Sequence, residues 1–80
     1  MSTLECVKKR LTELSNERNL TVNALAHISG VHPSTVKNIF NGSSKNPGIV
    51  TLKKLCDGLE ITVRDFFDSE LFDECEQEIK

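Results

Sequence analysis

Two short amphipathic segments joined by a three-residue turn constrain the fold of this chain more than any other feature. Thr21 is a suitable N-cap for a helix of about eight residues, and Gly30 ends that helix because glycine adopts positive φ without steric cost. Pro33 stands where the next helix would begin, because the N–H that proline lacks has no hydrogen-bond partner inside a helix at the first position. We therefore predict a second short helix over about 33–40, which stops at Asn41-Gly42.

A longer amphipathic helix is predicted before this pair, from about Thr3 to Arg18. Ser2 and Glu5 have the spacing of a capping box, in which each side chain accepts a hydrogen bond from the backbone N–H of the other residue. Asn19 follows as a left-handed stop, because asparagine tolerates positive φ better than most residues.

Two further helices are predicted after residues 41–47, whose composition is that of a turn-rich loop. The second of them opens at another capping box, Thr62 with Asp65. No segment has the pattern of a strand, so we predict an all-α, compact five-helix bundle. The side chains expected to face its core are Leu4, Cys6, Val7, Leu11, Leu14, Leu20, Leu25, Ala26, Ile28, Val31, Val36, Ile39, Phe40, either Ile49 or Val50, Leu52, Leu55, Cys56, Leu59, Val63, Phe66 and Phe67.

Length and charge divide the chain into a body and a tail. A chain of 80 residues holds one domain at most, which we place at 1–69, with an acidic extension over 70–80. Residues 1–64 carry nine Lys/Arg and five Asp/Glu, or +4, whereas residues 65–80 carry seven acids and one lysine, or −6. We expect the tail to be either a frayed, exposed helix or a segment anchored through Leu71, Phe72 and Ile79.

The outward face of the helix over 33–40 is suited to reading DNA. A short turn containing glycine is typical of a helix-turn-helix, whose second helix enters the major groove. Asparagine can pair with adenine and lysine can reach guanine acceptors, so Asn38 and Lys37 are the leading candidates for base contacts. The hydroxyls of Ser34 and Thr35 can bond to a base or a phosphate, and we assign Thr35 to phosphate.

Residues Leu11–Phe67, about 57 of 80, resemble the Cro/C1-type (XRE) helix-turn-helix family of phage and bacterial repressors. The resemblance is carried by LTxxxLAxxSGVxxSTVxNIxNG over 20–42, SKNP over 44–47 and LKKLCDGLEITVRDFF over 52–67. It implies a lambda-repressor-like bundle that binds double-stranded DNA at a palindromic operator as a homodimer.

The resemblance also implies a role for individual residues. It places base readout on Pro33, Ser34, Lys37 and Asn38. It places phosphate contacts near Val22, Asn23, Asn41, Ser43 and Lys45.

Three departures from the family pattern change what we expect. The family commonly has glycine after the fourth helix, where this chain has Glu60, so either Glu60 is left-handed or the helix ends differently, at Gly58. The family usually has a polar side chain at the position of Val22, so only the backbone N–H of Val22 is expected to serve. The family also often has a buried arginine–glutamate pair at the positions of Ser15 and Phe40. Because both partners are replaced together, no charge is stranded, and we interpret Phe40 as a core residue.

The remaining reactive residues indicate no metal, cofactor or catalytic site. His27 and His32 lack a second ligand at metal spacing, and we expect His32 to be the exposed N-cap of its helix. The cysteines show no paired motif, so Cys6 and Cys56 are expected to pack in the core and Cys75 to be exposed. No nucleophile–base pair or phosphate-binding loop is present, which argues against an enzyme and against a small-molecule ligand.

These observations lead to one hypothesis and one alternative. The hypothesis is a cytoplasmic DNA-binding transcriptional regulator of the repressor type, because no apolar run or leader indicates a membrane or secreted protein. The alternative is a helix-turn-helix module that binds another protein, such as an antitoxin or anti-repressor component, since fold alone does not exclude it.

Overall fold

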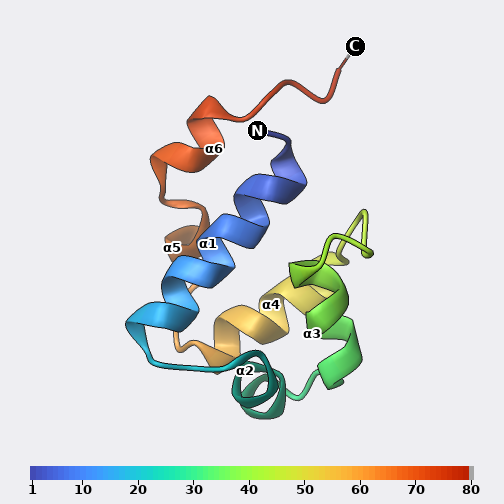
Figure 1. The fold of residues 1–80 in the computed structure, drawn as a ribbon. Helices are drawn as coiled ribbons and strands as arrows, with labels where there is room; N and C mark the ends of the chain where they lie inside the picture. The colour runs from blue at the N-terminus through green and yellow to red at the C-terminus, as the bar shows by residue number, and fades with distance from the viewer. Residues whose placement is uncertain (80) are drawn as a thin grey trace.

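The computed structural model describes residues 1–79, which form six α-helices and no strand (Figure 1). The helices are α1 (Thr3–Glu17), α2 (Val22–Ser29), α3 (Pro33–Phe40), α4 (Ile49–Gly58), α5 (Val63–Phe67) and α6 (Glu70–Glu74). The predicted all-α class is confirmed. The sixth helix was not in the predicted bundle of five, and it lies in the acidic extension. None of the helices within residues 1–79 is long and apolar enough to cross a membrane.

Both predicted capping boxes are present. Ser2 Oγ accepts from the N–H of Glu5 at 3.2 Å, and Glu5 Oε1 accepts from the N–H of Ser2 at 3.3 Å. These hydrogen bonds stabilise the carboxylate and hold the pKa of Glu5 below its usual value. Thr62 and Asp65 form the same pair of hydrogen bonds, at 3.0 and 3.3 Å, at the start of α5.

Residues with positive φ follow each of the helices α1 to α4, and the one after α3 is Gly42, with φ 83°. Asn19 after α1 has φ 54° and Gly30 after α2 has φ 66°, as the sequence predicts. Glu60 has φ 59°, which decides between the two predicted ends of α4. The helix continues through Gly58, Leu59 caps it, and Glu60 takes the conformation in which glycine is usual.

The core is a single cluster to which five of the six helices contribute. Cys6 is buried outside this cluster, whose own buried residues are Val7, Leu11, Leu14, Leu25, Ala26, Val36, Ile39, Leu52, Leu55, Cys56, Leu59 and Phe66. Phe40 is half-buried and packs against this cluster, so its interpretation as a core residue is correct only in part. The buried counterpart position, Ser15, has a hydroxyl without a hydrogen-bond partner among residues 1–79.

The prediction that Ile28 is buried is wrong, because α2 approaches α4 through the next residue. Ile28 is 47% exposed, whereas Ser29 is buried. A Cβ added at Gly58 would lie 2.1 Å from Ser29 Oγ and 3.0 Å from Ser29 Cα, so the two backbones are in close contact there. One residue is about 100° of helical rotation, which turns Ile28 away from this contact.

The predictions that either Ile49 or Val50 and that Phe67 face the core are also wrong. Ile49 and Val50 in the first turn of α4 are 67% and 66% exposed, because the buried face of that helix begins only at Leu52. Phe67 is also exposed, but its ring packs edge-on against Phe66, with centroids 5.0 Å apart. The apolar pattern marks these positions correctly as helical, but it does not show where the bundle ends.

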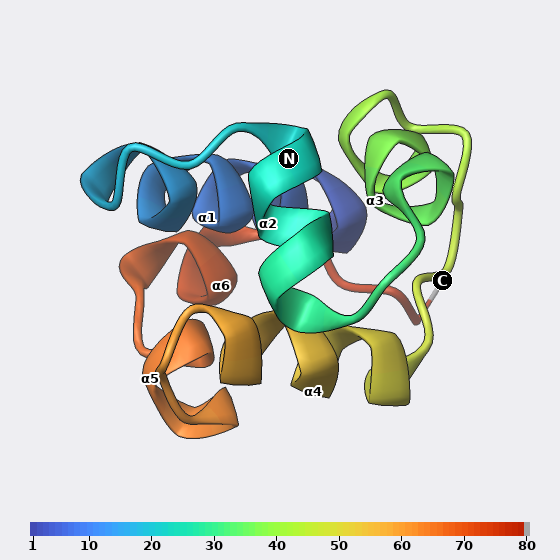
Figure 2. The same cartoon turned by 90° about the horizontal axis from the view of Figure 1, so that it is seen from below.

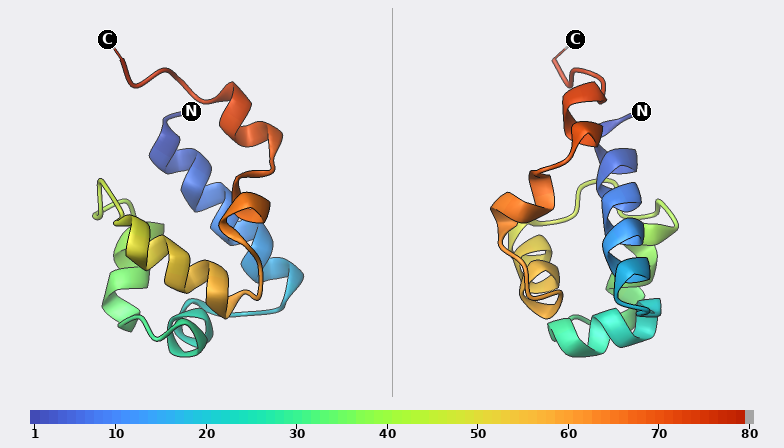
Figure 3. Two further views of the ribbon diagram at one scale, coloured as in Figure 1. Left: turned by 180° about the vertical axis from the view of Figure 1, so that it is seen from behind. Right: turned by 90° about the vertical axis from the view of Figure 1, so that its left-hand side faces the viewer.

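The acidic extension packs on α1, on the side away from α3 (Figures 1 and 3). The Phe72 ring lies against Phe67, with centroids 4.8 Å apart, and Leu71 is half-buried. Ile79 is 90% exposed. Anchoring is therefore confirmed for Leu71 and Phe72 and wrong for Ile79.

We expect Gly58→Ala to destabilise the protein by about 1–3 kcal/mol, because its methyl group would overlap α2. Chemical denaturation monitored by circular dichroism measures the loss. Lys54→Ala, on an exposed position of α4, is the matched control and should be neutral. A Gly58→Ala variant as stable as the control would show that the helices separate without penalty.

Candidate nucleic-acid interface

The turn between α2 and α3 sets the direction of α3. Gly30 has φ 66° and ψ 29°, and the N–H of Val31 donates to the carbonyl of Ala26 at 3.0 Å, which closes a Schellman motif. The chain therefore changes direction sharply, and α3 crosses α2 steeply (Figures 1 and 2). No other helix covers the outer side of α3 in these views.

The α3 helix is divided into a buried and an exposed face. Val36 and Ile39 are buried and fix the helix to the core. The five predicted contact residues of this helix are all exposed: Pro33, Ser34, Thr35, Lys37 and Asn38. The face thus presents hydroxyl, ammonium and carboxamide groups without a large apolar side chain among them.

His32 is the N-cap of α3 and is exposed, as predicted. Its Nδ1 accepts from the N–H of Ser34 at 3.1 Å and lies 2.8 Å from Ser34 Oγ. Because the capping nitrogen must carry a lone pair, the neutral ring has its proton on Nε2. The ring therefore both begins the helix and orients the Ser34 hydroxyl.

The loop after α3 is fixed by its own hydrogen bonds. Asn41 Oδ1 accepts from the N–H of Ser43 at 2.8 Å, and the N–H of Ser44 donates to the carbonyl of Asn38 at 2.9 Å. These bonds use the carboxamide oxygen of Asn41 and leave its Nδ2 group as a donor. Asn41, Ser43 and Lys45 are all exposed.

Lys8 of α1 is a residue of this surface that the sequence analysis missed. A Cβ added at Gly42 would lie 3.7 Å from Lys8 Nζ, so the ammonium group lies beside the loop between Asn41 and Ser43. The two segments are 34 positions apart in the sequence. No local pattern links them, and only the packing of α1 brings the charge there.

The start of α2 explains the unusual Val22. Thr21 Oγ1 accepts from the N–H of Ala24 at 3.1 Å, which leaves the N–H groups of Val22 and Asn23 without a partner inside the helix. The Val22 side chain is half-buried against the core, whereas Asn23 is exposed. An apolar residue therefore fits at position 22, since its side chain packs inward.

Acidic side chains are absent from the central half of the sequence. Residues 18–56 contain no Asp or Glu and five basic residues, Arg18, Lys37, Lys45, Lys53 and Lys54, for a net charge of +5. The acidic α6 lies across α1 from α3 (Figures 1 and 3). Helices α2 and α3 are therefore kept apart from the negative charge that dominates the composition. Within residues 1–79 no group of three or more His, Cys, Asp or Glu could hold a metal ion.

A family model described as the Cro/C1-type HTH DNA-binding domain matches residues 10–70. The chain belongs to this family. Among curated proteins, it is 41% identical over 58 residues to the HTH-type transcriptional repressor RghR of Bacillus subtilis. It is 42% identical over 53 residues to the uncharacterized HTH-type transcriptional regulator RghRB of the same organism.

These Cro/C1-type relatives are longer than the chain. The matches cover 72% and 66% of this chain but only 43% and 38% of RghR and RghRB. A solved structure is similar over more of its length: the crystal structure of the prophage Lp1 protein 11 has a TM-score of 0.80 and 44% identity. That match covers 92% of this chain and 99% of the other. The helical arrangement of most of the chain thus has a counterpart in a solved structure.

We expect His32→Ala to destabilise this Cro/C1-type domain by about 0.5–2 kcal/mol, because the first turn of α3 loses its side-chain acceptor. Thermal unfolding measures the change. His32→Ser, which supplies another capping oxygen, should retain most of the stability. If the serine variant were as unstable as the alanine variant, the ring would stabilise the domain through something other than the cap.

Proposed function

We propose that the chain is a sequence-specific DNA-binding regulator, a repressor of transcription that inserts α3 into the major groove of its operator. The observation that carries the proposal is the exposed polar face of α3 on a segment free of acidic residues. A B-DNA major groove about 12 Å wide admits a helix, and the absence of carboxylates lets that helix approach phosphates without repulsion. We place this activity in the cytoplasm, where a bacterial chromosome lies.

The proposed base contacts come from the first two turns of α3. They are Pro33, Ser34, Lys37 and Asn38. Asn38 can pair with an adenine edge, Lys37 can donate to guanine acceptors, and Pro33 offers an apolar surface to a thymine methyl group. The hydrogen bond between Ser34 Oγ and His32 Nδ1 directs the serine proton, so that Ser34 would act on DNA as an acceptor.

The proposed phosphate contacts surround that face. They are the N–H of Val22 and the side chains of Asn23, Thr35, Asn41, Ser43 and Lys45, to which the geometry adds Lys8. Free N–H groups at the start of α2 favour an anion, and the Nδ2 group of Asn41 remains a donor. Such contacts supply affinity and register, whereas α3 selects the sequence.

Repression is proposed from the relatives and from the size of the domain. RghR is described as a repressor, and this chain spans 43% of its length. We propose that residues 1–69 form the DNA-binding domain and that residues 70–80 are an acidic extension of it, whose helix α6 packs on α1. A small domain seated on an operator can exclude other proteins from the same stretch of DNA.

A homodimer on a palindromic operator is proposed because one copy offers few contacts. Ile49 and Val50 give α4 an exposed aliphatic surface directly after the loop that follows α3. Ile49 borders an open groove of about 930 Å³ whose apolar lining includes Leu4, Pro47 and Phe67. A two-fold axis beside this surface would pair the two recognition helices, which a B-DNA operator requires to be about 34 Å apart.

We expect Asn38→Ala to weaken binding by about 1–3 kcal/mol at operators with the preferred base and to relax selectivity at that position. Lys45→Ala should weaken binding about evenly across sequences and reduce the salt dependence, because it removes one phosphate contact. Operators selected from a random pool, followed by fluorescence anisotropy across a salt series, measure both effects.

Lys54→Ala, outside the proposed surface, is the control for these two variants. Equal losses on all sequences for Asn38→Ala and Lys45→Ala would contradict the separation of roles. A folded protein that selects no operator at low salt but forms a stable protein complex would instead support an antitoxin or anti-repressor module.

For the dimer, we expect Ile49→Asp to shift the protein from dimer to monomer and to abolish cooperative binding to a palindrome, because it places a charge in the apolar contact. Sedimentation velocity and titration of half-site and full-site DNA measure these changes. Ile28→Asp, at an exposed aliphatic position of α2, is the matched control. A dimer that persists in Ile49→Asp would place the interface elsewhere.

A further inference from the structure

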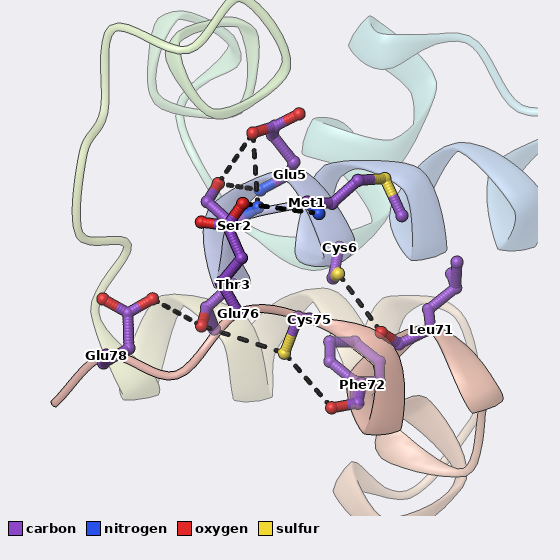
Figure 4. A network of polar contacts seen from close by, with 10 residues as sticks. All are labelled: Met1, Ser2, Thr3, Glu5, Cys6, Leu71, Phe72, Cys75, Glu76 and Glu78. Carbon is purple, nitrogen blue, oxygen red and sulfur yellow. Dashed lines mark hydrogen bonds and ion pairs between the residues drawn. The ribbon is translucent and has the colours of Figure 1, made fainter. Parts of the chain in front are cut away.

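Two of the three cysteines, from opposite ends of the sequence, meet where α6 packs on α1 (Figure 4). Cys6 is buried in α1, and Cys75 is the half-buried cap that ends α6. The Cys6 thiol donates to the carbonyl of Leu71 at 3.3 Å, and Thr3 Oγ1 lies 4.0 Å from Cys75 Sγ. Thr3 and Cys6 share a face of α1, and Leu71 and Cys75 share a face of α6.

The electrostatic surroundings of Cys6 agree with this juxtaposition. Burial raises the pKa of the Cys6 thiol, and the neighbouring Cys75 raises it further. Burial also raises the pKa of Cys56, which lies on α4, but the charged groups that act on that thiol are Asp57 and Lys53. The thiol of Cys56 is thus a buried core group, whereas the other two thiols are neighbours.

The tail around Cys75 is already held against α1. The N–H of Glu76 donates to the carbonyl of Met1 at 2.9 Å, and Thr3 Oγ1 donates to Glu78 Oε2 at 2.6 Å. Cys75 itself has extended backbone, with ψ 154°, and its thiol donates to the carbonyl of Phe72 at 3.1 Å, a hydrogen bond that breaks when the side chain turns toward Cys6. A small adjustment at this residue can bring the sulfurs together without unfolding α6.

We propose that Cys6 and Cys75 form a reversible disulfide that ties α6 to α1, with a low-molecular-weight disulfide as the oxidant. Because Cys75 is the more accessible thiol, it reacts first. Its thiolate attacks one sulfur of the oxidant, forms a mixed disulfide and releases one small thiolate.

Cys6 completes the exchange from inside the fold. The Cys6 sulfur, as its thiolate, attacks the Cys75 sulfur and releases the second small thiolate. Two protein thiols are oxidised to one disulfide, one small disulfide is reduced to two small thiols, and the two protons end on those thiols. The oxidant does not need to reach Cys6, so burial slows this step through the raised pKa of the thiol but does not block it.

The bond would close a loop from residue 6 to residue 75, which is most of the chain. Closing so long a loop restricts the unfolded chain strongly and therefore stabilises the folded bundle. Helix α6, which Cys75 caps, lies on the side of α1 away from α3, so the redox state and the DNA contacts would be separate properties.

The test uses the full-length protein, first reduced and then exposed to glutathione disulfide. After free thiols are alkylated, peptide mapping by mass spectrometry should find Cys6 linked to Cys75 and Cys56 alkylated. Cys56→Ser should give the same linkage, whereas Cys75→Ser and Cys6→Ala should not. The melting temperature of the oxidised protein should rise by more than about 10 °C and return on reduction with dithiothreitol.

Other outcomes would overturn the proposal. These are a disulfide between two chains through Cys75, a linkage that includes Cys56, or a mixed disulfide that persists on Cys75 while Cys6 stays reduced. Cys75→Ser changes a surface residue, so it tests the linkage even if a substitution at Cys6 disturbs the core. No readout involves DNA, so a failure here leaves the proposed regulatory function untouched.

Discussion

The close approach of α2 to α4 at Ser29 and Gly58 is the contact on which the rest of the bundle depends. A side chain at position 58 would overlap the backbone of α2, so only glycine allows the helices to meet at this distance. The contact fixes the end of α2, and Gly30 turns the chain immediately afterwards. The position of α3, and with it the exposed face of that helix, therefore depends on Gly58, which lies on α4 and not on α2 or α3.

The first helix holds the other end of the bundle through two arginines. Arg10 Nε and Nη2 donate to the carbonyls of Phe66 and Asp65, both at 2.8 Å, and so satisfy the last turn of α5. Arg18 Nε donates to the carbonyl of Leu59 at 3.1 Å, where α4 ends. These charge-assisted bonds tie α1 to two helix ends, and the same helix carries Lys8 to the loop after α3.

Local features of the fold could be predicted because their causes are local. The capping boxes, the left-handed stops and the bounds of α3 each depend on residues within one or two turns of each other. What could not be predicted depends on contacts distant in sequence. Ile28 is exposed because α4 packs against α2 at Gly58 and Ser29. Lys8 lies beside the loop after α3 because of the way α1 packs, and α6 is held in place by α1. The exposed face of α3 was predictable, since only its periodicity with Val36 and Ile39 was needed.

The segregation of charge reconciles a net charge of −2 with a surface suited to DNA. Repulsion between the acidic tail and phosphates weakens with distance and is screened beyond about 8 Å at physiological salt. Because α6 lies across α1 from α3, its carboxylates act on DNA mainly through that screened field. In the proposed complex the remaining attraction would come from a few lysines, each of which releases about one counterion, and from neutral backbone N–H groups, which release none. So few contacts give one copy modest affinity, and joining two copies on one operator multiplies it without adding a contact to either surface. An interface between copies would therefore contribute more to operator affinity than any single side chain of α3.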